Sequence, residues 1–252
     1  MANLPNREAV QMPSEDIAKQ RVDERIFVGD AATIVDATER RICGRGNVRS
    51  LPVAEGLALS GVRTATHLED GRSSEFHSGV LGLPIVQHSW SQANCPFPSE
   101  IPSIIVAETL QQVADQCVAS HLLSDRAGVF VLSVVSESLR RMIGQAVLPD
   151  QTSLESLLGP ANDVPTSKEN RTIRSGNWLE QTALACFSEV ESKLRRACGP
   201  INTEGVNGAE HIVVASGDTA RLVRSLARSG GHCFGLISVN QLRPLPLSTI
   251  LG

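Results

Sequence analysis

Residues 209–247 read AEHIVVASGDTARLVRSLARSGGHCFGLISVNQLRPLPL, and this stretch decides the expected fold. Residues 212–215 are a short apolar run rich in β-branched side chains, which predicts a strand. A Ser-Gly-Asp-Thr turn at 216–219 supplies helix-capping residues, so we expect a helix that ends at a Gly-Gly pair. Residues 233–239 predict a second strand. Two strands joined by one helix through such short connections run parallel with a right-handed crossover, and parallel strands need cover on both faces.

The helix in this stretch is amphipathic. Its apolar and basic side chains separate onto two faces, with Leu222, Val223, Leu226 and Ala227 on one and Arg221, Arg224 and Arg228 on the other.

Strand and helix patterns alternate through the first half of the chain. Residues 129–135 are almost purely apolar, which is typical of a central parallel strand covered on both faces. The alternation predicts a doubly wound α/β domain. We therefore expect a flexible leader (1–24), an α/β domain (25–147), a linker or wrapping arm (148–177), and a helix followed by a smaller βαβ domain (178–252).

The composition excludes several classes of protein. A formal net charge of −4, an aromatic content of 3% and the absence of tyrosine give no basis for binding nucleic acid. The six cysteines include no C-x-x-C pair, so we expect reduced, mostly buried thiols and neither an iron–sulfur cluster nor a structural zinc site. No apolar run is long enough to span a membrane and the N-terminus is polar, which predicts a cytoplasmic protein without membrane contact.

Four segments resemble one enzyme family in order and spacing. They are EGLALSGVRTATHLEDG (55–71), GVLGLPIVQHSW (79–90), IPSIIVAETLQQVADQCVASHLLSDRAGVFVLSV (101–134), and the C-terminal unit with its Arg-Pro-Leu-Pro sequence (243–246). These resemble the pyruvate:ferredoxin (2-oxoacid:acceptor) oxidoreductases. The resemblance implies a thiamine-diphosphate-binding-like, mostly parallel α/β sheet with a second, smaller and truncated transketolase-C-terminal-like domain.

The resemblance also implies a site. In the family a glutamate hydrogen-bonds the aminopyrimidine of thiamine diphosphate, and Glu55, followed by Gly56, is the nearest candidate here. The alternative is an ordinary glutamate on a helix surface. The family's two substrate loops are replaced by ERRICGRGN (39–47) and VVSESLRRMIG (134–144).

The diphosphate half of the cofactor site is not expected in this chain. Gly29-Asp30 and Gly217-Asp218 echo the first part of a Gly-Asp-Gly motif, but a helix cap explains both. Thiamine diphosphate would thus bind only together with a partner chain. His67, His77 and His88 lie on different predicted elements, so we expect satisfied or surface histidines and no metal site.

Two functions remain open. The first is a partial or divergent subunit of a thiamine-diphosphate-dependent 2-oxoacid:ferredoxin or flavodoxin oxidoreductase, which needs partner subunits and is inactive in isolation. The second is a degenerate, non-catalytic interaction or assembly protein of the same origin; a homodimer is compatible with either. A flavin- or nucleotide-binding α/β protein is a third reading.

Overall fold

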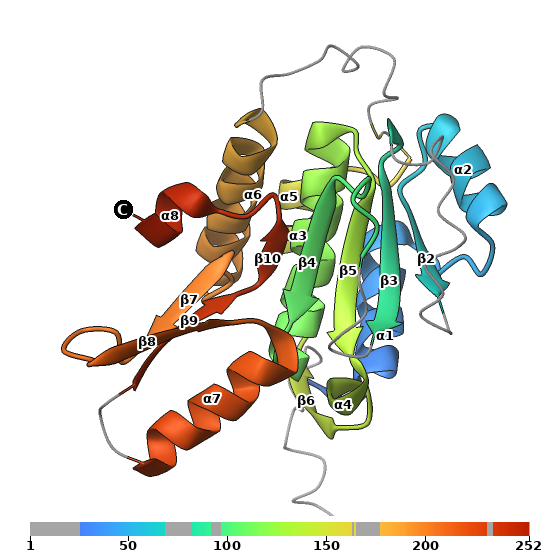
Figure 1. Cartoon of the computed structure of the whole chain (residues 1–252). Coiled ribbons are helices and arrows are strands. Elements are labelled where there is room, and N and C mark those ends of the chain that lie inside the picture. The colour runs from blue at the N-terminus through green and yellow to red at the C-terminus, as the bar shows by residue number, and fades with distance from the viewer. Residues whose placement is uncertain are drawn as a thin grey trace, which may run out of the picture.

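The computed structural model describes residues 26–68, 82–91, 97–162, 164, 177–230 and 234–251 of this chain. The predicted leader and the residues His77, Cys95 and Cys233 lie outside these ranges. Within them the chain is a mixed α/β protein, as the sequence predicts (Figure 1).

The central sheet has five strands in the order β10-β4-β5-β3-β2. Strands β2 (Thr64–Leu68), β3 (Ile85–Ser91), β5 (Val131–Ser136) and β4 (Ser103–Ala107) pair in parallel, and the short β10 (Gln241–Arg243) is antiparallel to β4. All residues of β4 and β5 are buried. The prediction of a mostly parallel sheet with a fully covered apolar strand is confirmed.

Side chains alternate between two apolar cores, one on each face of this sheet. Ile105, Val131 and Val135 belong to the larger core, whereas Leu132 and Val134 belong to the smaller one. The larger core lies against helices α1 (Ala31–Cys43), α3 (Leu110–Ala127), α5 (Gln151–Leu158) and α6 (Trp178–Leu194), and the smaller against α2 (Leu51–Leu59) (Figure 1). The period of two in β4 and β5 therefore covers the sheet on both faces.

Two helix caps fall where the sequence places them, whereas Ser216 before α7 (Gly217–Gly230) has no hydrogen-bond partner for its hydroxyl among the described residues. Thr109 accepts a hydrogen bond from the backbone N–H of Gln112 at the start of α3, and Asp30 accepts one from Thr33 at the start of α1. Both are ordinary N-caps, and Gly44 and Gly128 end these two helices in the left-handed conformation.

Several elements were not expected. Strand β6 (Ile143–Val147) pairs antiparallel with β1 (Ile26–Asp30) after the one-turn helix α4 (Glu137–Arg140). Helix α5 lies inside the predicted linker, where Asp150 caps it and two leucines bury its inner face. Strand β7 (Ile201–Glu204) is another. β6 and β7 each leave residues exposed, so neither has the apolar run by which a strand is recognised.

The C-terminal unit has the predicted order of strand, helix and strand, but the described residues leave one face of its first strand exposed. Strands β8 (His211–Ala215) and β9 (Phe234–Val239) pair in parallel and α7 (Gly217–Gly230) connects them, while β7 adds to β9 antiparallel. A short α8 (Leu247–Leu251) follows. Because α6 packs against α3 and β10 joins the central sheet, residues on both sides of the predicted domain boundary share contacts. That boundary remains a prediction.

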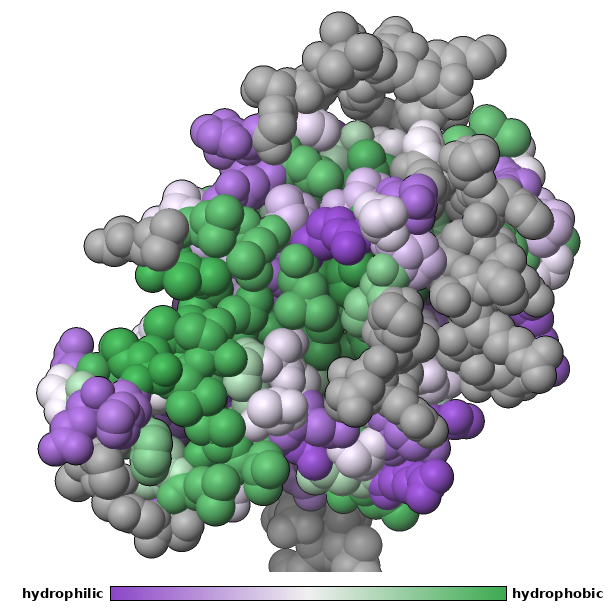
Figure 2. Space-filling view, viewed as in Figure 1, coloured by the Kyte–Doolittle hydropathy of each residue, from purple (hydrophilic) through white to green (hydrophobic). Residues whose placement is uncertain are grey.

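The arginine face of α7, not its leucine face, is turned to the rest of the chain. Arg224 pairs with the buried Glu108 at 2.9 Å and with Glu204 at 2.8 Å. Leu222 and Leu226 are 61% and 58% exposed. Ile212, Val214 and Phe234 of β8 and β9 are also exposed. We call these five residues the apolar surface, and Figure 2 shows hydrophobic residues gathered over β8, β9 and α7.

Candidate functional site

A pocket of about 410 Å³ lies at the carboxyl ends of two parallel strands. His67 is the last residue but one of β2, and Trp90 holds the same place in β3. Helices α1 and α4 and the segment before α2 supply further lining residues, among them Arg40, Arg140, Asn47 and Arg49. In open α/β sheets this edge is where ligands bind.

Aromatic and cationic groups are stacked in this pocket. The rings of His67 and Trp90 are stacked with centroids 5.2 Å apart, and the guanidinium of Arg140 lies 5.3 Å from the Trp90 ring centroid. A guanidinium over an indole face is held by cation–π attraction. Nη1 of Arg140 also lies 3.6 Å from Oε2 of Glu137 in a partly exposed ion pair.

The charge of the lining is positive. Three arginines face a single acid, Asp36, whose Oδ2 lies 2.9 Å from Arg40 Nε. Both polar side-chain atoms of Asn47 and Nε2 of His67 are buried without a hydrogen-bond partner in the described part of the chain. Unpartnered buried polar atoms are costly unless a ligand or water satisfies them. The lining therefore suits an organic anion that has hydrogen-bonding oxygens.

A second pocket, of about 480 Å³, lies between the end of β6, α5 and the end of α6. Arg196, in its lining, is already engaged with Asp115 at 2.6 Å. It lies away from the carboxyl ends of the parallel strands, so the pocket at His67 and Trp90 is the better candidate.

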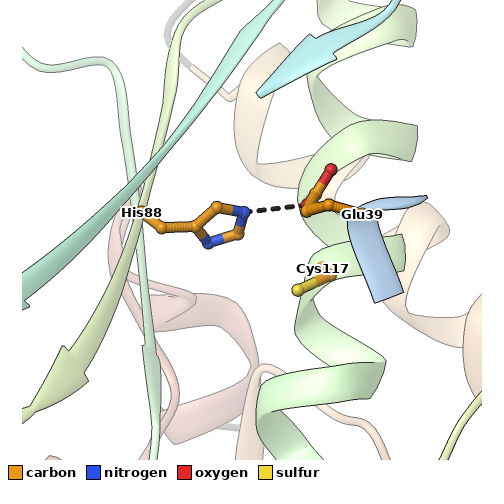
Figure 3. A group of neighbouring side chains, drawn as sticks. All are labelled: Glu39, His88 and Cys117. Carbon is orange, nitrogen blue, oxygen red and sulfur yellow. Dashed lines mark hydrogen bonds and ion pairs between the residues drawn. The ribbon is translucent and has the colours of Figure 1, made fainter. Parts of the chain in front are cut away.

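Behind the candidate pocket lies a buried cluster centred on Glu39 of α1. His88 Nε2 is 2.8 Å from Glu39 Oε1, and His121 Nε2 is 2.8 Å from Oε2. Cys43 Sγ lies 3.5 Å from Oε2, and Cys117 contributes a further thiol. Figure 3 shows Glu39, His88 and Cys117 converging from α1, β3 and α3.

Glu39 is ionised in this cluster. Burial opposes its charge, but the charge of His121 and the hydrogen bonds from His121 and His88 outweigh burial and hold the pKa of Glu39 below its usual range. A carboxylate only accepts hydrogen bonds, so both histidines donate through Nε2. Burial and the Glu39 charge raise the pKa of the Cys43 and Cys117 thiols, so both are protonated at neutral pH.

His67 joins the cluster to the pocket. Its ring centroid is 5.7 Å from that of His88. Burial, with the charge of His88, lowers the pKa of His67 to about 4. His67 is therefore neutral at physiological pH and can donate or accept a hydrogen bond in the pocket.

This pKa gives a testable pH dependence. An unfolded histidine titrates near 6.5, so the unfolded chain binds more protons between pH 6.5 and 4, and stability contributed by neutral His67 is lost as pH falls through that window. We expect His67→Gln to remove on the order of 2–3 kcal/mol of this loss. Urea unfolding at a series of pH values measures it, with the exposed His211→Gln as control. Parallel pH profiles for wild type and His67→Gln would contradict the expectation.

The residues predicted from the family resemblance lie elsewhere. Glu55 is only partly buried in the middle of α2, and open space surrounds Gly56. Neither lines the pocket at His67 and Trp90. Asp218, in the second partial match to the Gly-Asp-Gly motif, accepts hydrogen bonds from Ser136 and Ser138.

Part of the buried cluster can be found in the sequence from the spacing of residues within single helices. Glu39 and Cys43 are four residues apart on α1, and Cys117 and His121 are four apart on α3. Residues at this spacing share a helix face. The expectation of satisfied or surface histidines holds only for Nε2 of His88, which pairs with Glu39, since Nδ1 of His88 and Nε2 of His67 are buried without a partner among the described residues.

The comparisons with known proteins concern the fold. No protein-family model and no curated protein matches this chain. Among solved structures, it is similar to a 2-oxoglutarate:ferredoxin oxidoreductase from Magnetococcus marinus with 2-oxoglutarate, coenzyme A and succinyl-CoA bound. The TM-score is 0.58 over 89% of this chain, at 14% identity. The likeness lies in the fold.

The chain covers 55% of the length of that solved chain. This distant structural similarity agrees with the predicted α/β oxidoreductase-like architecture. In the described residues, no helix has the length and apolar character that a membrane crossing requires.

Proposed function

We propose that this chain is a divergent, cytoplasmic subunit of a 2-oxoacid:acceptor oxidoreductase-type assembly that binds an organic anion of the 2-oxoacid class. The observation that carries the proposal is the arginine-lined pocket at the carboxyl ends of β2 and β3. Arginine recognises a carboxylate by paired hydrogen bonds, and the unpartnered polar atoms of Asn47 and His67 Nε2 offer further hydrogen bonds to an oxoacid.

The position of the pocket in the sequence supports the same function. Arg40, Gly46 and Asn47 belong to residues 39–47, and Arg140 belongs to residues 134–144. These are the two segments that stand where the resembled family has its substrate loops. The family's loop sequences are absent, yet the segments in their place come together around one basic pocket.

A thiamine diphosphate site would need a second chain. A carboxylate that drives proton transfer on the aminopyrimidine needs a dry environment, and Glu55 is only partly buried in this chain. The described residues of this chain alone therefore do not fit the cofactor. We propose that a partner chain covers Glu55 and supplies the diphosphate and iron–sulfur sites.

The apolar surface is the proposed docking site for that partner. Ile212 and Val214 project from the same face of β8, and Leu222 and Leu226 project from α7. Parallel strands in stable proteins have both faces covered. A partner chain is favoured as occupant because the solved oxidoreductase of similar fold is nearly twice as long as the part this chain covers, so further protein accompanies the same fold there.

Co-purification tests the assembly. We expect the tagged chain to recover a partner that carries a Gly-Asp-Gly motif, and the complex to bind thiamine diphosphate and reduce an acceptor dye when given a 2-oxoacid. Glu55→Gln is expected to lower turnover at least a hundredfold, as removal of a general acid or base does. The exposed Glu155→Gln is the control. Unchanged turnover in Glu55→Gln would remove Glu55 from the site.

Leu226→Glu tests the docking surface in the same experiment. A charge in the centre of an apolar interface is expected to abolish recovery of the partner, whereas Ser225→Glu, an exposed neighbour on α7, is expected to retain it. Circular dichroism checks that both variants fold. If Leu226→Glu instead splits a homodimer while partner recovery is unchanged, the surface belongs to a second copy and the partner assignment is wrong.

The apolar surface also favours a second candidate, a non-catalytic interaction or assembly protein derived from the same fold. This function needs the surface but neither Glu55 nor the cofactor. A complex that forms through Leu226, yet binds no thiamine diphosphate and turns over no 2-oxoacid, would establish it in place of the first proposal.

A further inference from the structure

The buried cluster holds three metal-ligand types within bonding reach of a single point. Around Glu39 Oε2, His121 Nε2 lies at 2.8 Å and Cys43 Sγ at 3.5 Å, and Cys43 Sγ lies 3.9 Å from His121 Nε2. Tetrahedral zinc with sulfur, nitrogen and oxygen ligands keeps its ligand atoms about 3.3–3.7 Å apart. Only the carboxylate and imidazole must separate, by about 0.5 Å, to admit the ion.

The scaffold holds these ligands rigidly. Glu39 and Cys43 lie one helical turn apart on α1, and His121 comes from α3, which packs directly against α1. All three side chains are buried, among close-packed Ile42, Val118 and Leu122. A preformed and buried set of ligands binds a metal ion without first having to be ordered.

We propose that Glu39, Cys43 and His121 bind one zinc ion between helices α1 and α3. A thiolate, an imidazole and a carboxylate form a donor set that suits zinc, whereas magnesium and calcium take oxygen ligands. Such a site is independent of the 2-oxoacid pocket and of any partner chain.

His88 acts on the ion through Glu39. Its Nε2 donates to Oε1, the carboxylate oxygen that does not face Cys43, and so fixes the direction of Oε2. Hydrogen bonds of this kind orient metal-bound carboxylates and strengthen binding. When zinc binds, the Cys43 thiol loses its proton to solvent and His121 binds through Nε2 as the neutral imidazole that carries its proton on Nδ1, so affinity rises with pH.

Metal analysis of the chain purified without chelators or a metal-affinity tag tests the proposal. We expect about one zinc ion per chain. Cobalt added to the metal-depleted protein is expected to produce a thiolate-to-metal charge-transfer band. At a zinc concentration a hundred times the dissociation constant, Tm is expected to rise by about 5–10 °C above that of the EDTA-treated protein.

Variants assign the ligands. Cys43→Ser and His121→Asn are each expected to lower zinc affinity at least tenfold. Cys43→Ser is also expected to remove the cobalt charge-transfer band, because it removes the thiolate. Cys186→Ser, which changes another buried cysteine outside the cluster, is expected to retain both. Because a variant can fail to fold, the circular dichroism spectra of the variants and the wild type in EDTA are compared first. The cobalt spectrum of the wild type tests the site without any variant.

Two results would overturn the proposal. The first is a folded wild-type chain that contains no zinc and yields no cobalt charge-transfer band, because the cluster is then held by hydrogen bonds alone. Loss of the ion in Cys117→Ser while Cys43→Ser keeps it would place the ion in the neighbouring group of Glu39, His88 and Cys117 instead.

Discussion

Glu39→Ala is expected to lower the free energy of unfolding by about 3–5 kcal/mol, because it removes the carboxylate that accepts hydrogen bonds from two buried histidine rings. His88 and His121 are 0% and 1% exposed, and each donates to one oxygen of this carboxylate. Without it both Nε2 protons lack an acceptor, and a cavity opens beside Cys43. Glu39→Gln keeps the volume and one acceptor oxygen, so an intermediate loss is expected.

Urea unfolding in EDTA measures this effect without any contribution from a metal ion. Asp36→Ala, three residues earlier on the same helix, is the control. Asp36 is 39% exposed in a surface pair with Arg40, and such pairs contribute at most about 1 kcal/mol. If Glu39→Ala loses no more stability than Asp36→Ala, the buried cluster does not hold α1 against α3 and β3.

Arg63→Ala is expected to lower the free energy of unfolding by a similar amount, about 3–5 kcal/mol. Arg63 is 2% exposed, and its guanidinium lies 2.8 Å from Asp125 of α3. It also donates to the backbone carbonyls of Leu158 and Gly159 at the end of α5. Its removal leaves a buried carboxylate and two carbonyls without their donor.

The effect of Arg63→Ala depends on pH in a definite direction. Burial raises the pKa of Asp125, and the charge of Arg63 opposes that rise. Without Arg63 the buried carboxyl of Asp125 keeps its proton to a higher pH in the folded variant than in the unfolded chain. The stability of the variant therefore falls as pH increases. We expect a greater loss at pH 8 than at pH 5, measured by urea unfolding. Arg40→Ala, with a side chain 66% exposed, is the control, and equal losses in both variants would contradict the account.

Much of the fold could be predicted because buried strands and helices place apolar residues at a regular spacing in the sequence. Residues 129–135 read as a doubly covered strand because β5 is buried on both faces, and Thr109 marks the start of α3 because capping requires its hydroxyl. Strands β6 and β7 escape prediction because exposed positions interrupt their apolar pattern. The two faces of α7 are evident in the sequence, but Glu108 and Glu204 decide which face packs, and neither is marked as its partner by spacing along the helix.

The candidate pocket could not be predicted from the sequence. Arg49 and Arg140 each look like ordinary surface arginines, and only the order of strands in the sheet brings them together with Trp90. The buried cluster differs, because the pairs Glu39–Cys43 and Cys117–His121 have helical spacing in the sequence itself. That the two pairs meet each other, and that His88 on β3 joins them, depends on the tertiary fold.

Isothermal titration of 2-oxoglutarate into the purified chain tests the central claim, that the pocket binds a 2-oxoacid-type anion. We expect saturable binding at one site, and at least tenfold weaker binding for the double variant Arg49→Gln, Arg140→Gln, because loss of each charge-assisted contact costs about 1.5–3 kcal/mol. Arg228→Gln, 70% exposed on α7 and outside the pocket, is expected to bind as the wild type does. Absence of saturable binding to the wild type, or equal binding to the wild type and the double variant, would contradict the claim.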